Sequence, residues 1–493
     1  MAIAKICGIE TEYGIVQKGT AESNPIVASS ILVNAYATSA FRRIKWDFED
    51  ESPGNDARGF RRDGALPPEV ETHLVNAVLT NGARFYVDHA HPEYSSPECA
   101  NALEATLYDR AGELVLRRAM DAARQLSDDE IVIYKNNSDG KSNSYGTHEN
   151  YLMSRDVPFN RIAEQVMPFF ITRQIYCGSG KVGTEAAGHS KVDFQLTQRA
   201  DFFEEEVGLE TTLKRPIVNT RDEPHGDARK YRRLHVIIGD ANLSEFSTFL
   251  KLGTTSIVLS MIEDGHLDGL EFTVAAPVHE VREVSYDTTL TRAIELHNGK
   301  RLTALQMQWE YLDRARKWAD TQGLDTVGGD EVGQQILTQW EEVLTALETD
   351  VMSLSNKLDW VAKYKLFDAY RQRNNLKWDS PRLAAMDLQY SDLRPEKSLY
   401  QRLSMQTLCS QQDVERSVTE PPRNTRAYFR GKCLEKWGPL VSSANWDSMV
   451  FDLGQDPLQR IPMMDPLKGT ADMVDDLLDS CATPQDLIKK LGA

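Results

Sequence analysis

The chain has 493 residues, with 74 acidic and 56 basic side chains and a formal net charge of −18. This length exceeds one ordinary hydrophobic core and predicts a large domain with a smaller one beside it. The negative charge argues against general affinity for nucleic acid. The sequence shows no signal-peptide pattern and no apolar run long enough to span a membrane, so we expect a cytoplasmic protein.

The first predicted strand, residues 6–14, alternates between apolar and acidic side chains. Ile9 and Tyr13 lie on one face, and Glu10 and Glu12 lie on the other, because side chains on a strand change face at every residue. Two carboxylates on one face repel each other unless a cation lies between them, and Mg²⁺ prefers oxygen ligands. The pattern indicates either a magnesium site or an ordinary solvated strand face.

A helix and a long insertion follow. Residues 26–44 carry apolar side chains at helical spacing. Residues 42–71 are rich in charge, glycine and proline and have no sustained period, which predicts a mobile loop inserted near the site. The loop is interpreted either as a lid over the site or as a disordered spacer.

The next predicted strand begins after the turn signal Asn81-Gly82. Its apolar residues at 83, 85 and 87 face a core, whereas Arg84, Tyr86 and Asp88 share the opposite face. A cation, a phenol and a carboxylate in a row can bind phosphate, orient a metal and supply a base. An edge strand with a surface ion pair is the alternative.

The middle of the chain alternates between helical and extended patterns. Helices are predicted over 101–126, 158–173, 244–263 and much of 301–376, whereas 270–300 is predicted as strands and turns. A strand over 233–239 places Arg233 and His235 on one face, where they suit a phosphate or a metal. Residues 421–431 have the composition of a domain boundary.

Seven motifs resemble, in order and over nearly the whole chain, those of one known family. They are residues 8–14, 81–88, 91–94, 143–151, 219–225, 231–242 and 425–431. The family is the Dop/PafA group of actinobacterial Pup-modifying enzymes, related in fold to glutamine synthetase and γ-glutamyl-cysteine ligases. The resemblance implies an α+β fold with a curved, mainly antiparallel sheet backed by helices in a catalytic domain (1–420) and a small C-terminal α/β domain (421–493).

The inserted loop and the turn Asp88-His-Ala-His-Pro-Glu93 resemble the hydrolase branch of this family rather than its ligase branch. This branch implies an ATP- and Mg²⁺-dependent enzyme of the proteasome pathway. Such an enzyme deamidates the C-terminal glutamine of Pup and cleaves the isopeptide bond between Pup and substrate lysines. The alternative is a PafA-type Pup–protein ligase on the same fold.

The resemblance also implies roles for individual residues. Asp88 is the expected catalytic carboxylate, acting either as a general base or as a covalent nucleophile. The expected metal positions are Glu10, Tyr86, Glu93, His148 and His235. The expected nucleotide-binding positions are Arg84, Ser96, Arg233, Trp446 and Glu12.

The implied partners are Pup and pupylated proteins, with no nucleic acid and no membrane. Because Pup is acidic, it needs a locally basic, partly apolar groove. The candidates for this groove are Arg199, Lys214, Arg215, Arg229, Lys230 and Arg232. Two further interpretations are a zinc amidohydrolase built on His89-Ala90-His91 and a scaffold without catalysis.

Overall fold

The computed structural model describes residues 1–19, 24–40, 44–49, 51–62, 75–126, 130–185, 190–454 and 456–492. At its centre lies a six-stranded sheet in the order β15-β10-β1-β8-β7-β6, and each neighbouring pair is antiparallel. Its strands are β1 (Cys7–Glu12), β6 (Asn76–Val78), β7 (Arg84–Asp88), β8 (His91–Ser95), β10 (Thr147–Ser154) and β15 (Tyr231–Val236). The mixed fold with a mainly antiparallel sheet is confirmed.

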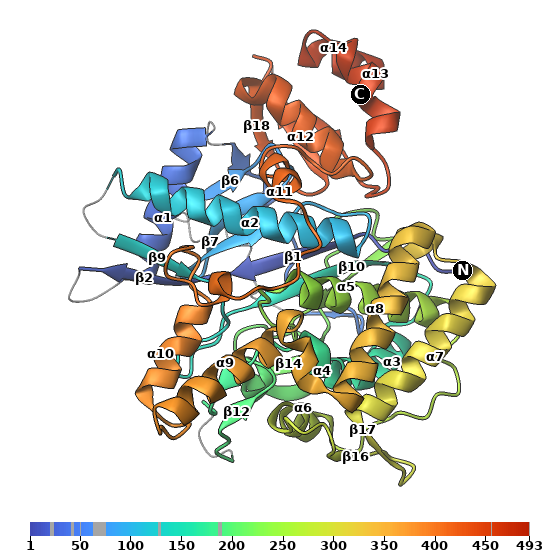
Figure 1. Ribbon diagram of the computed structural model, residues 1–493. Helices are drawn as coiled ribbons and strands as arrows, with labels where there is room; N and C mark the ends of the chain where they lie inside the picture. The colour runs from blue at the N-terminus through green and yellow to red at the C-terminus, as the bar shows by residue number, and fades with distance from the viewer. Residues whose placement is uncertain are drawn as a thin grey trace.

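One face of this sheet is apolar and is covered by helices. Ile9, Phe85 and Val87 are all at most 3% exposed, as the alternation of the two early strands predicts. Helices α1 (Pro25–Ala40), α2 (Ala102–Ala123) and α5 (Glu245–Asp264) pack against this face (Figure 1). The other face carries the acidic, basic and histidine side chains that concern function.

Helices α2 and α5 begin at side-chain caps. Asn101 accepts a hydrogen bond from the backbone of Glu104, and Ser244 accepts one from Ser247. Helix α5 ends at Gly265, whose φ of 77° lies in the left-handed region that glycine adopts without strain. The two helices predicted over 101–126 and 244–263 are therefore present, because these local end signals agree with the helical spacing of the apolar residues.

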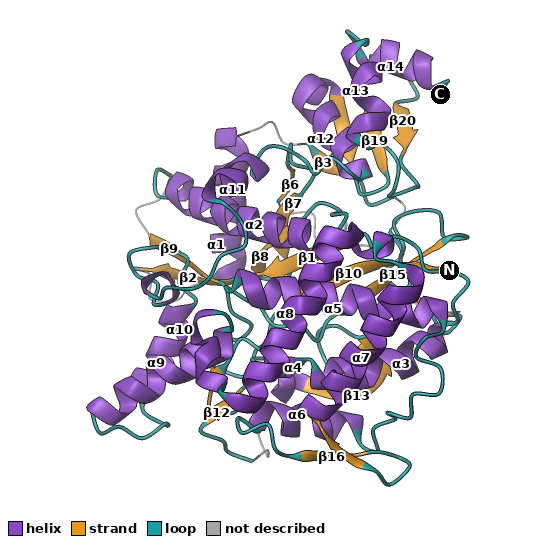
Figure 2. Cartoon of the chain, turned by 45° about the vertical axis from the view of Figure 1, so that its right-hand side comes forward, coloured by secondary structure: helices purple, strands orange, loops and turns teal. Residues whose placement is uncertain are grey.

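Further helices of the large region are α3 (Phe159–Thr172), α4 (Gln174–Cys177), α6 (Pro277–Tyr286), α7 (Ala304–Gln322), α8 (Gly329–Thr349), α9 (Asp359–Arg373), α10 (Pro381–Tyr390) and α11 (Gln411–Ser417). Helices α3, α4, α7 and α8 pack against α5, whereas α11 packs against α2 (Figure 2). The prediction of strands and turns over 270–300 is wrong at α6, a short helix that begins at Pro277. No helix among the described residues is both long and apolar enough to cross a membrane.

Several short strand pairs connect these layers. They are β2 (Gly14–Lys18) with β9 (Glu130–Tyr134), β4 (Asn55–Asp56) with β5 (Phe60–Arg61), β11 (Lys181–Val182) with β12 (Phe194–Gln195), β13 (Phe203–Gly208) with β14 (Arg215–Asn219), and β16 (Ala293–Glu295) with β17 (Arg301–Thr303). The β13–β14 pair is parallel, and the other four are antiparallel.

The C-terminal region has a hydrophobic core of its own. It contains a four-stranded sheet in the order β20-β19-β18-β3 and three helices. The elements are β3 (Lys45–Trp46), β18 (Val441–Ala444), β19 (Ser448–Phe451), β20 (Gln459–Pro462), α12 (Arg426–Trp437), α13 (Ala471–Asp479) and α14 (Pro484–Leu491). Because β3 and Val78 contribute to this core, the region depends on residues before 421, and the division at 420/421 stays a prediction.

Part of the insertion at 42–71 is docked onto the rest of the chain. Trp46 lies in β3, which pairs with β18. The Asp56 carboxylate accepts a hydrogen bond from the Thr220 hydroxyl at 2.6 Å, and the Glu223 carboxylate accepts one from the backbone of Ser52 at 2.6 Å. Residues 42, 43, 50 and 63–71 lie outside the described residues, so the mobility of the loop stays a prediction.

Glu98 connects the end of β8 to helix α12. Its carboxylate accepts hydrogen bonds from Arg426 Nε at 2.7 Å and from Arg430 Nη2. Arg430 is fully buried and also donates to the carbonyl oxygen of Gly82. Burial raises the pKa of Glu98, but the two guanidinium groups outweigh it and hold this pKa at about 2.

Replacing Glu98 with glutamine is expected to lower the free energy of unfolding by roughly 3 kcal/mol at neutral pH. Because the folded-state pKa is depressed, this stabilisation is present above the ordinary carboxyl pKa of 4.5 and disappears as the pH falls towards 2. Chemical denaturation at several pH values measures the effect. The control is Glu435→Gln, which removes an exposed pair with Lys432 and should cost at most about 1 kcal/mol. If both substitutions lower the free energy of unfolding equally, the buried contacts of Glu98 with the two arginines contribute no more than an exposed ion pair does.

Candidate active site

Three carboxylates converge on the polar face of the central sheet. Glu93 on β8 is paired with Glu12 of β1 on one side and with Tyr86 of β7 on the other. One oxygen atom of each of Glu12, Asp88 and Glu93 lies within 4.8 Å of the other two. Carboxylates this close repel unless a cation compensates them, and a set of oxygen donors alone suits Mg²⁺.

Glu93 is the most deeply buried member of this cluster. It is 2% exposed and accepts hydrogen bonds from the Tyr86 hydroxyl at 2.5 Å and from the Ser95 hydroxyl at 3.2 Å. Burial, followed by the charges of Asp88, Glu10 and Glu12, raises its pKa well above the ordinary value. Burial and the adjacent Glu93 likewise raise the pKa of Tyr86, so the phenol stays protonated and acts as a donor.

Asp88 is the member of the cluster that solvent reaches. Its side chain is 33% exposed, against 13% for Glu12. One carboxylate oxygen lies 2.8 Å from Nδ1 of His89, whose φ of 50° marks a tight turn directly after β7. Desolvation raises the pKa of Asp88, but the contact with His89 and the charges of Arg84 and His148 together outweigh it, and the net pKa lies below the ordinary value. Asp88 is therefore an accessible, ionised carboxylate.

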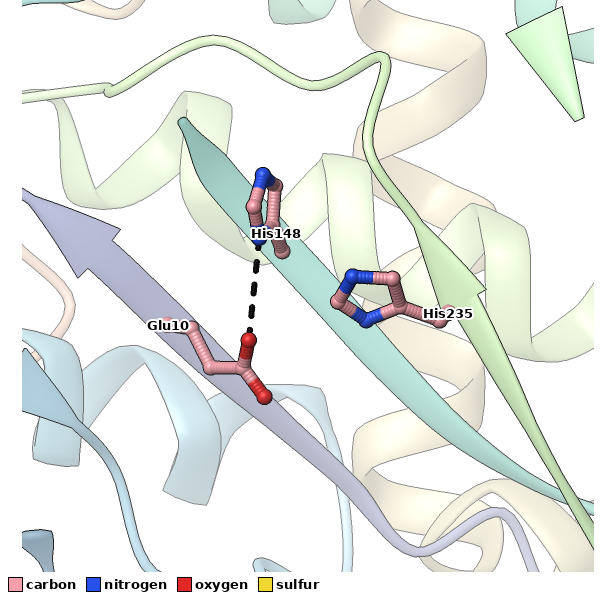
Figure 3. A group of neighbouring side chains, drawn as sticks. All are labelled: Glu10, His148 and His235. Atoms are coloured by element: carbon pink, nitrogen blue, oxygen red, sulfur yellow. Dashed lines mark ion pairs between the residues drawn. The ribbon is translucent and has the colours of Figure 1, made fainter. Parts of the chain in front are cut away.

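A second group, Glu10, His148 and His235, lies farther along the same face (Figure 3). Glu10 is paired with His148 across β1 and β10, and His148 Nδ1 lies 3.6 Å from a Glu10 oxygen. The rings of His148 and His235 are 4.9 Å apart. Figure 3 shows the three side chains on the side of the strands that faces away from the helices.

His235 has a nitrogen available for a ligand. Its Nδ1 lies 3.0 Å from the Asn150 side-chain oxygen and 3.2 Å from Arg233 Nη1, so it donates to the first or accepts from the second, depending on the tautomer. Its Nε2 is buried and meets no hydrogen-bond partner among the described residues. Burial and then the charge of Arg233 lower the pKa of His235 well below the ordinary value. A neutral imidazole whose Nε2 has no partner among the described residues fits a metal ligand in the tautomer with the proton on Nδ1.

Cationic side chains border this second group. Arg233 donates to Asn150 at 2.6 Å and lies 3.6 Å from Glu10. The Asn150 side-chain amide in turn donates a hydrogen bond to the Glu10 carboxylate at 2.9 Å, so Asn150 connects Arg233 with Glu10. Arg221 lies close enough that its charge lowers the pKa of His235, and its Nε is buried without a hydrogen-bond partner in the described part of the chain. Sequence reasoning missed Asn150 and Arg221, although both lie inside recognised motifs.

A pocket of about 570 Å³, including its open mouth, adjoins the second group. Residues that line it include Gly8, Glu10, Ser96, Arg233, Arg426 and Trp446. The Ser96 hydroxyl accepts from the Ile9 backbone at 2.9 Å and donates to the Pro97 carbonyl, so it fixes the wall of the pocket. The Trp446 ring packs edge-on against Trp46 at 5.2 Å. Of the five predicted nucleotide-binding residues, Ser96, Arg233 and Trp446 line this pocket. Glu12 lies instead with the carboxylate cluster.

Arg84, the fifth predicted nucleotide position, lies outside the lining of this pocket. Its guanidinium donates twice to the Asn76 side-chain oxygen, at 2.6 and 2.8 Å. It lies over the rings of Trp46 and Tyr86, at 4.0 and 3.7 Å from their centres. Its charge helps lower the pKa of Asp88, so Arg84 acts on the carboxylate cluster from the side of the inserted segment.

The basic residues considered for the Pup groove lie in different environments. Arg199 is buried, Arg232 is buried and lies 3.5 Å from Asp222, and Arg229 is almost fully exposed. They therefore do not line one surface. The zinc alternative also finds no support: neither His89 nor His91 belongs to either group of candidate metal ligands in the part of the chain that the structure describes.

Comparison with known proteins identifies the family. Residues 5–450 match the family described as Pup-ligase protein. The chain belongs to this family. Its relatives include a depupylase of Acidothermus cellulolyticus, 52% identical, and a Pup deamidase/depupylase of Mycobacterium tuberculosis, 49% identical, each aligned over 99% of both chains. A Pup–protein ligase of Kineococcus radiotolerans is 39% identical over 82% of this chain and 90% of its own.

Solved structures of the Pup-ligase family share the fold. The ligase PafA in complex with Pup superposes with a TM-score of 0.79 and 30% identity, over 99% of this chain and 95% of that chain. PafA in complex with ADP gives a TM-score of 0.74 and 35% identity, over 82% and 89% of the two chains. The shared architecture therefore covers ligases as well as hydrolases, and the fold alone does not separate the two activities.

Proposed function

We propose that this protein is an ATP- and Mg²⁺-dependent hydrolase of the cytoplasm that deamidates the C-terminal glutamine of Pup and cleaves Pup from substrate lysines. The observation that carries the proposal is the alignment with named depupylases at about half identity over 99% of both chains. The ligase relative is less similar and aligns with 82% of this chain. The accessible Asp88 carboxylate suits either hydrolytic reaction.

The pocket beside β1 is the proposed nucleotide site. Trp446 offers an aromatic face for a base, and Arg233 offers a guanidinium for a phosphate. Arg221, whose Nε has no partner among the described residues, supplies a second cation near Arg233 and His235. The solved PafA complex with ADP supports nucleotide use in this family.

The two groups of acids and histidines are the proposed Mg²⁺ sites. Glu12 and Glu93 would hold one ion, and Glu10 with His148 and His235 would hold or orient another through its ligands. The crowding of carboxylates that raises the pKa of Glu93 and the unused Nε2 of His235 both fit a bound cation. When bound, Mg²⁺ would neutralise the carboxylates and the phosphates and stabilise developing negative charge.

Asp88 is the proposed catalytic residue. Its ionised, accessible oxygens can take a proton from the water that attacks the amide. Alternatively, they can attack the amide carbonyl themselves, so that the C–N bond breaks, the amine leaves with a proton, and water opens the resulting mixed anhydride. His89 holds the carboxylate from the solvent side at 2.8 Å. The protonated Tyr86 hydroxyl donates a hydrogen bond to the neighbouring Glu93 carboxylate and so fixes its position. Because amide hydrolysis is downhill, the nucleotide serves as part of the site rather than as fuel.

The test of this function uses purified protein, Mg-ATP and Pup that ends in glutamine. Intact mass spectrometry should show conversion of the terminal amide to the acid. A PafA-type ligase would instead leave this Pup unchanged, and it would join glutamate-ended Pup to a lysine of an acceptor protein. That second result would refute the proposed hydrolase.

Replacing Trp446 with alanine is expected to weaken ADP binding roughly tenfold, because loss of base stacking costs about 1–3 kcal/mol. Isothermal titration calorimetry with ADP measures this change. The control is Trp378→Ala, which removes a ring stacked on Tyr364 and absent from the pocket lining. If both variants bind ADP as the wild type does, the nucleotide base lies elsewhere.

A further inference from the structure

The two histidines of the sequence His89-Ala90-His91 have different neighbours. Strands β7 and β8 form a hairpin in which Asp88 is paired with His91, so His89 and Ala90 are its two turn residues. His91 lies towards the carboxylate cluster, with its Nδ1 3.7 Å from a Glu12 oxygen. Nδ1 of His89 lies instead 2.8 Å from a carboxylate oxygen of Asp88. The turn therefore gives Asp88 a histidine of its own.

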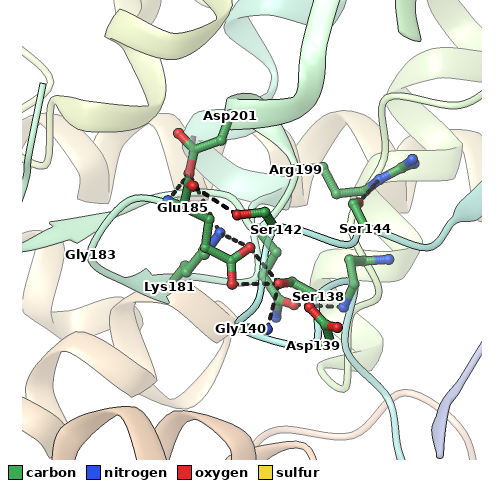
Figure 4. A network of polar contacts seen from close by, with 12 residues as sticks. Ser138, Asp139, Gly140, Ser142, Ser144, Lys181, Gly183, Glu185, Arg199 and Asp201 are labelled. Atoms are coloured by element: carbon green, nitrogen blue, oxygen red, sulfur yellow. Dashed lines mark hydrogen bonds and ion pairs between the residues drawn. The ribbon is translucent and has the colours of Figure 1, made fainter. Parts of the chain in front are cut away.

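The loop before β10 packs against His91. The rings of Tyr145 and His91 have their centres 4.3 Å apart. The loop is itself fixed, because the Ser138 hydroxyl donates to Glu185 at 2.6 Å and Lys181 pairs with Glu185 at 2.9 Å (Figure 4). His91 is thus packed into the wall of the site, and the exposed side of the turn is left to the other histidine.

The backbone of His89 has a conformation that most residues avoid. Its φ is 50°, in the left-handed region. The common two-residue hairpin turns need a positive φ at their first residue, which is ordinarily glycine, asparagine or aspartate. The turn is also anchored, because the Ser29 hydroxyl of α1 donates to the Ala90 carbonyl at 2.9 Å. Histidine therefore occupies a position where glycine would have the lower conformational energy.

The contact between His89 and Asp88 adds little to the stability of the fold. The two side chains are 61% and 33% exposed. Solvent screens the attraction between groups that are this exposed, so such contacts contribute little to the free energy of unfolding. An unfavourable backbone conformation directly beside a catalytic carboxylate is instead typical of a functional position.

We propose that His89 is a positioning residue, which fixes the side chain of Asp88 for the reaction with the Pup amide; this inference rests on the proposed function. An ionised carboxylate can only accept hydrogen bonds, so Nδ1 of His89 is the donor. The imidazole then holds one oxygen of Asp88 and leaves the other to take a proton from water or to attack the carbonyl. Restricting the freedom of a reactive group in this way raises the rate of the chemical step.

The test compares His89→Gly and His89→Asn with the wild type. Glycine removes the donor and suits the backbone, so kcat for glutamine-ended Pup should fall roughly 10- to 100-fold, the effect of losing one charge-assisted hydrogen bond. KM and the Kd for ADP should not change, and the melting temperature should not fall. Asparagine tolerates a positive φ and offers a side-chain N–H, so it should restore part of kcat. The control is Asn375→Gly, at an exposed position with a φ of 49°, which should leave kcat unchanged.

A crystal structure of each variant shows the orientation of Asp88 directly. The carboxylate should have one orientation in the wild type and in His89→Asn, and several in His89→Gly. A His89→Gly protein with the wild-type kcat, or with an unchanged Asp88 orientation, would overturn the positioning role. A melting temperature that falls together with kcat would overturn it too, because it would assign His89 to the stability of the turn. A wild type that never hydrolyses Pup would refute the proposed function instead, and the orientations of Asp88 would still decide the role of His89.

Discussion

The variant Asp88→Asn is expected to lose Pup hydrolysis by roughly 10²- to 10⁴-fold in kcat, the range that a positioned acid or base contributes. Asparagine keeps the size of the side chain but cannot accept a proton or attack a carbonyl as a carboxylate does. Within the part of the chain that the structure describes, the Asp88 side chain makes one hydrogen bond, to the exposed His89, so its replacement should not disturb folding. The rate is measured by mass spectrometry with glutamine-ended Pup, and ADP binding is measured in parallel.

The control is Asp320→Asn, which changes an exposed aspartate on α7 and should leave the rate unaltered. An Asp88→Asn protein that retained the wild-type rate would favour the interpretation of a scaffold without catalysis. A protein that lost both hydrolysis and ADP binding would show instead that Asp88 holds the nucleotide site together. Only loss of the rate with intact ADP binding assigns the chemistry to this carboxylate.

The second large effect is expected for Glu93→Gln. This substitution should stabilise the folded protein in the absence of magnesium and make it less stable than the wild type in the presence of magnesium. Without metal, the substitution removes a buried carboxylate that Asp88, Glu10 and Glu12 repel, so the melting temperature should rise. Glutamine still offers an oxygen to the Tyr86 hydroxyl. With Mg²⁺ at a hundred times its Kd, the wild type should gain about 2.7 kcal/mol, whereas the variant should gain little and should lose activity.

The pH dependence follows from the same crowding. The folded metal-free protein binds a proton at Glu93 more tightly than the unfolded chain does, because the folded-state pKa is raised. Its stability should therefore fall as the pH rises above the ordinary carboxyl pKa of 4.5, and the variant should lack this dependence. Glu104→Gln is the matched control, since burial alone raises the pKa of Glu104 and no metal group includes it. Equal Mg²⁺ stabilisation of all three proteins would exclude a site at Glu93.

The sequence predicts which face of a central strand each side chain lies on, but it does not predict which strands lie next to each other in the sheet. A period of two residues places Ile9 and Phe85 in the core and Glu10 and Asp88 on the other face, whatever the partner strand is. The order of the strands depends on contacts distant in sequence. Because β8 lies between β1 and β7, Glu12 meets Glu93 and joins the carboxylate cluster, although the family resemblance placed Glu12 among the nucleotide-binding positions.

The missed features have similar causes. Helix α6 has ten residues, so the helical spacing of Val278, Val281 and Val284 covers too short a stretch to stand out from the turns around it. Strand β3 has two residues, and it forms because β18, near the other end of the chain, offers an edge. The interest of Arg221 lies in its buried Nε, which has no hydrogen-bond partner among the described residues, and no sequence pattern records this. Asn150 shows the same limit, since its importance comes from contacts to Glu10, Arg233 and His235.

The measurement that tests the central claim most directly is the fate of a purified Pup–lysine conjugate mixed with the enzyme and Mg-ATP. We predict free Pup that ends in glutamate, a free lysine on the acceptor protein, and far more product molecules than ADP molecules. A conjugate that persists, together with new conjugates formed from glutamate-ended Pup at one ADP per bond, would contradict the account. That result would assign the chain to the ligase activity of its family.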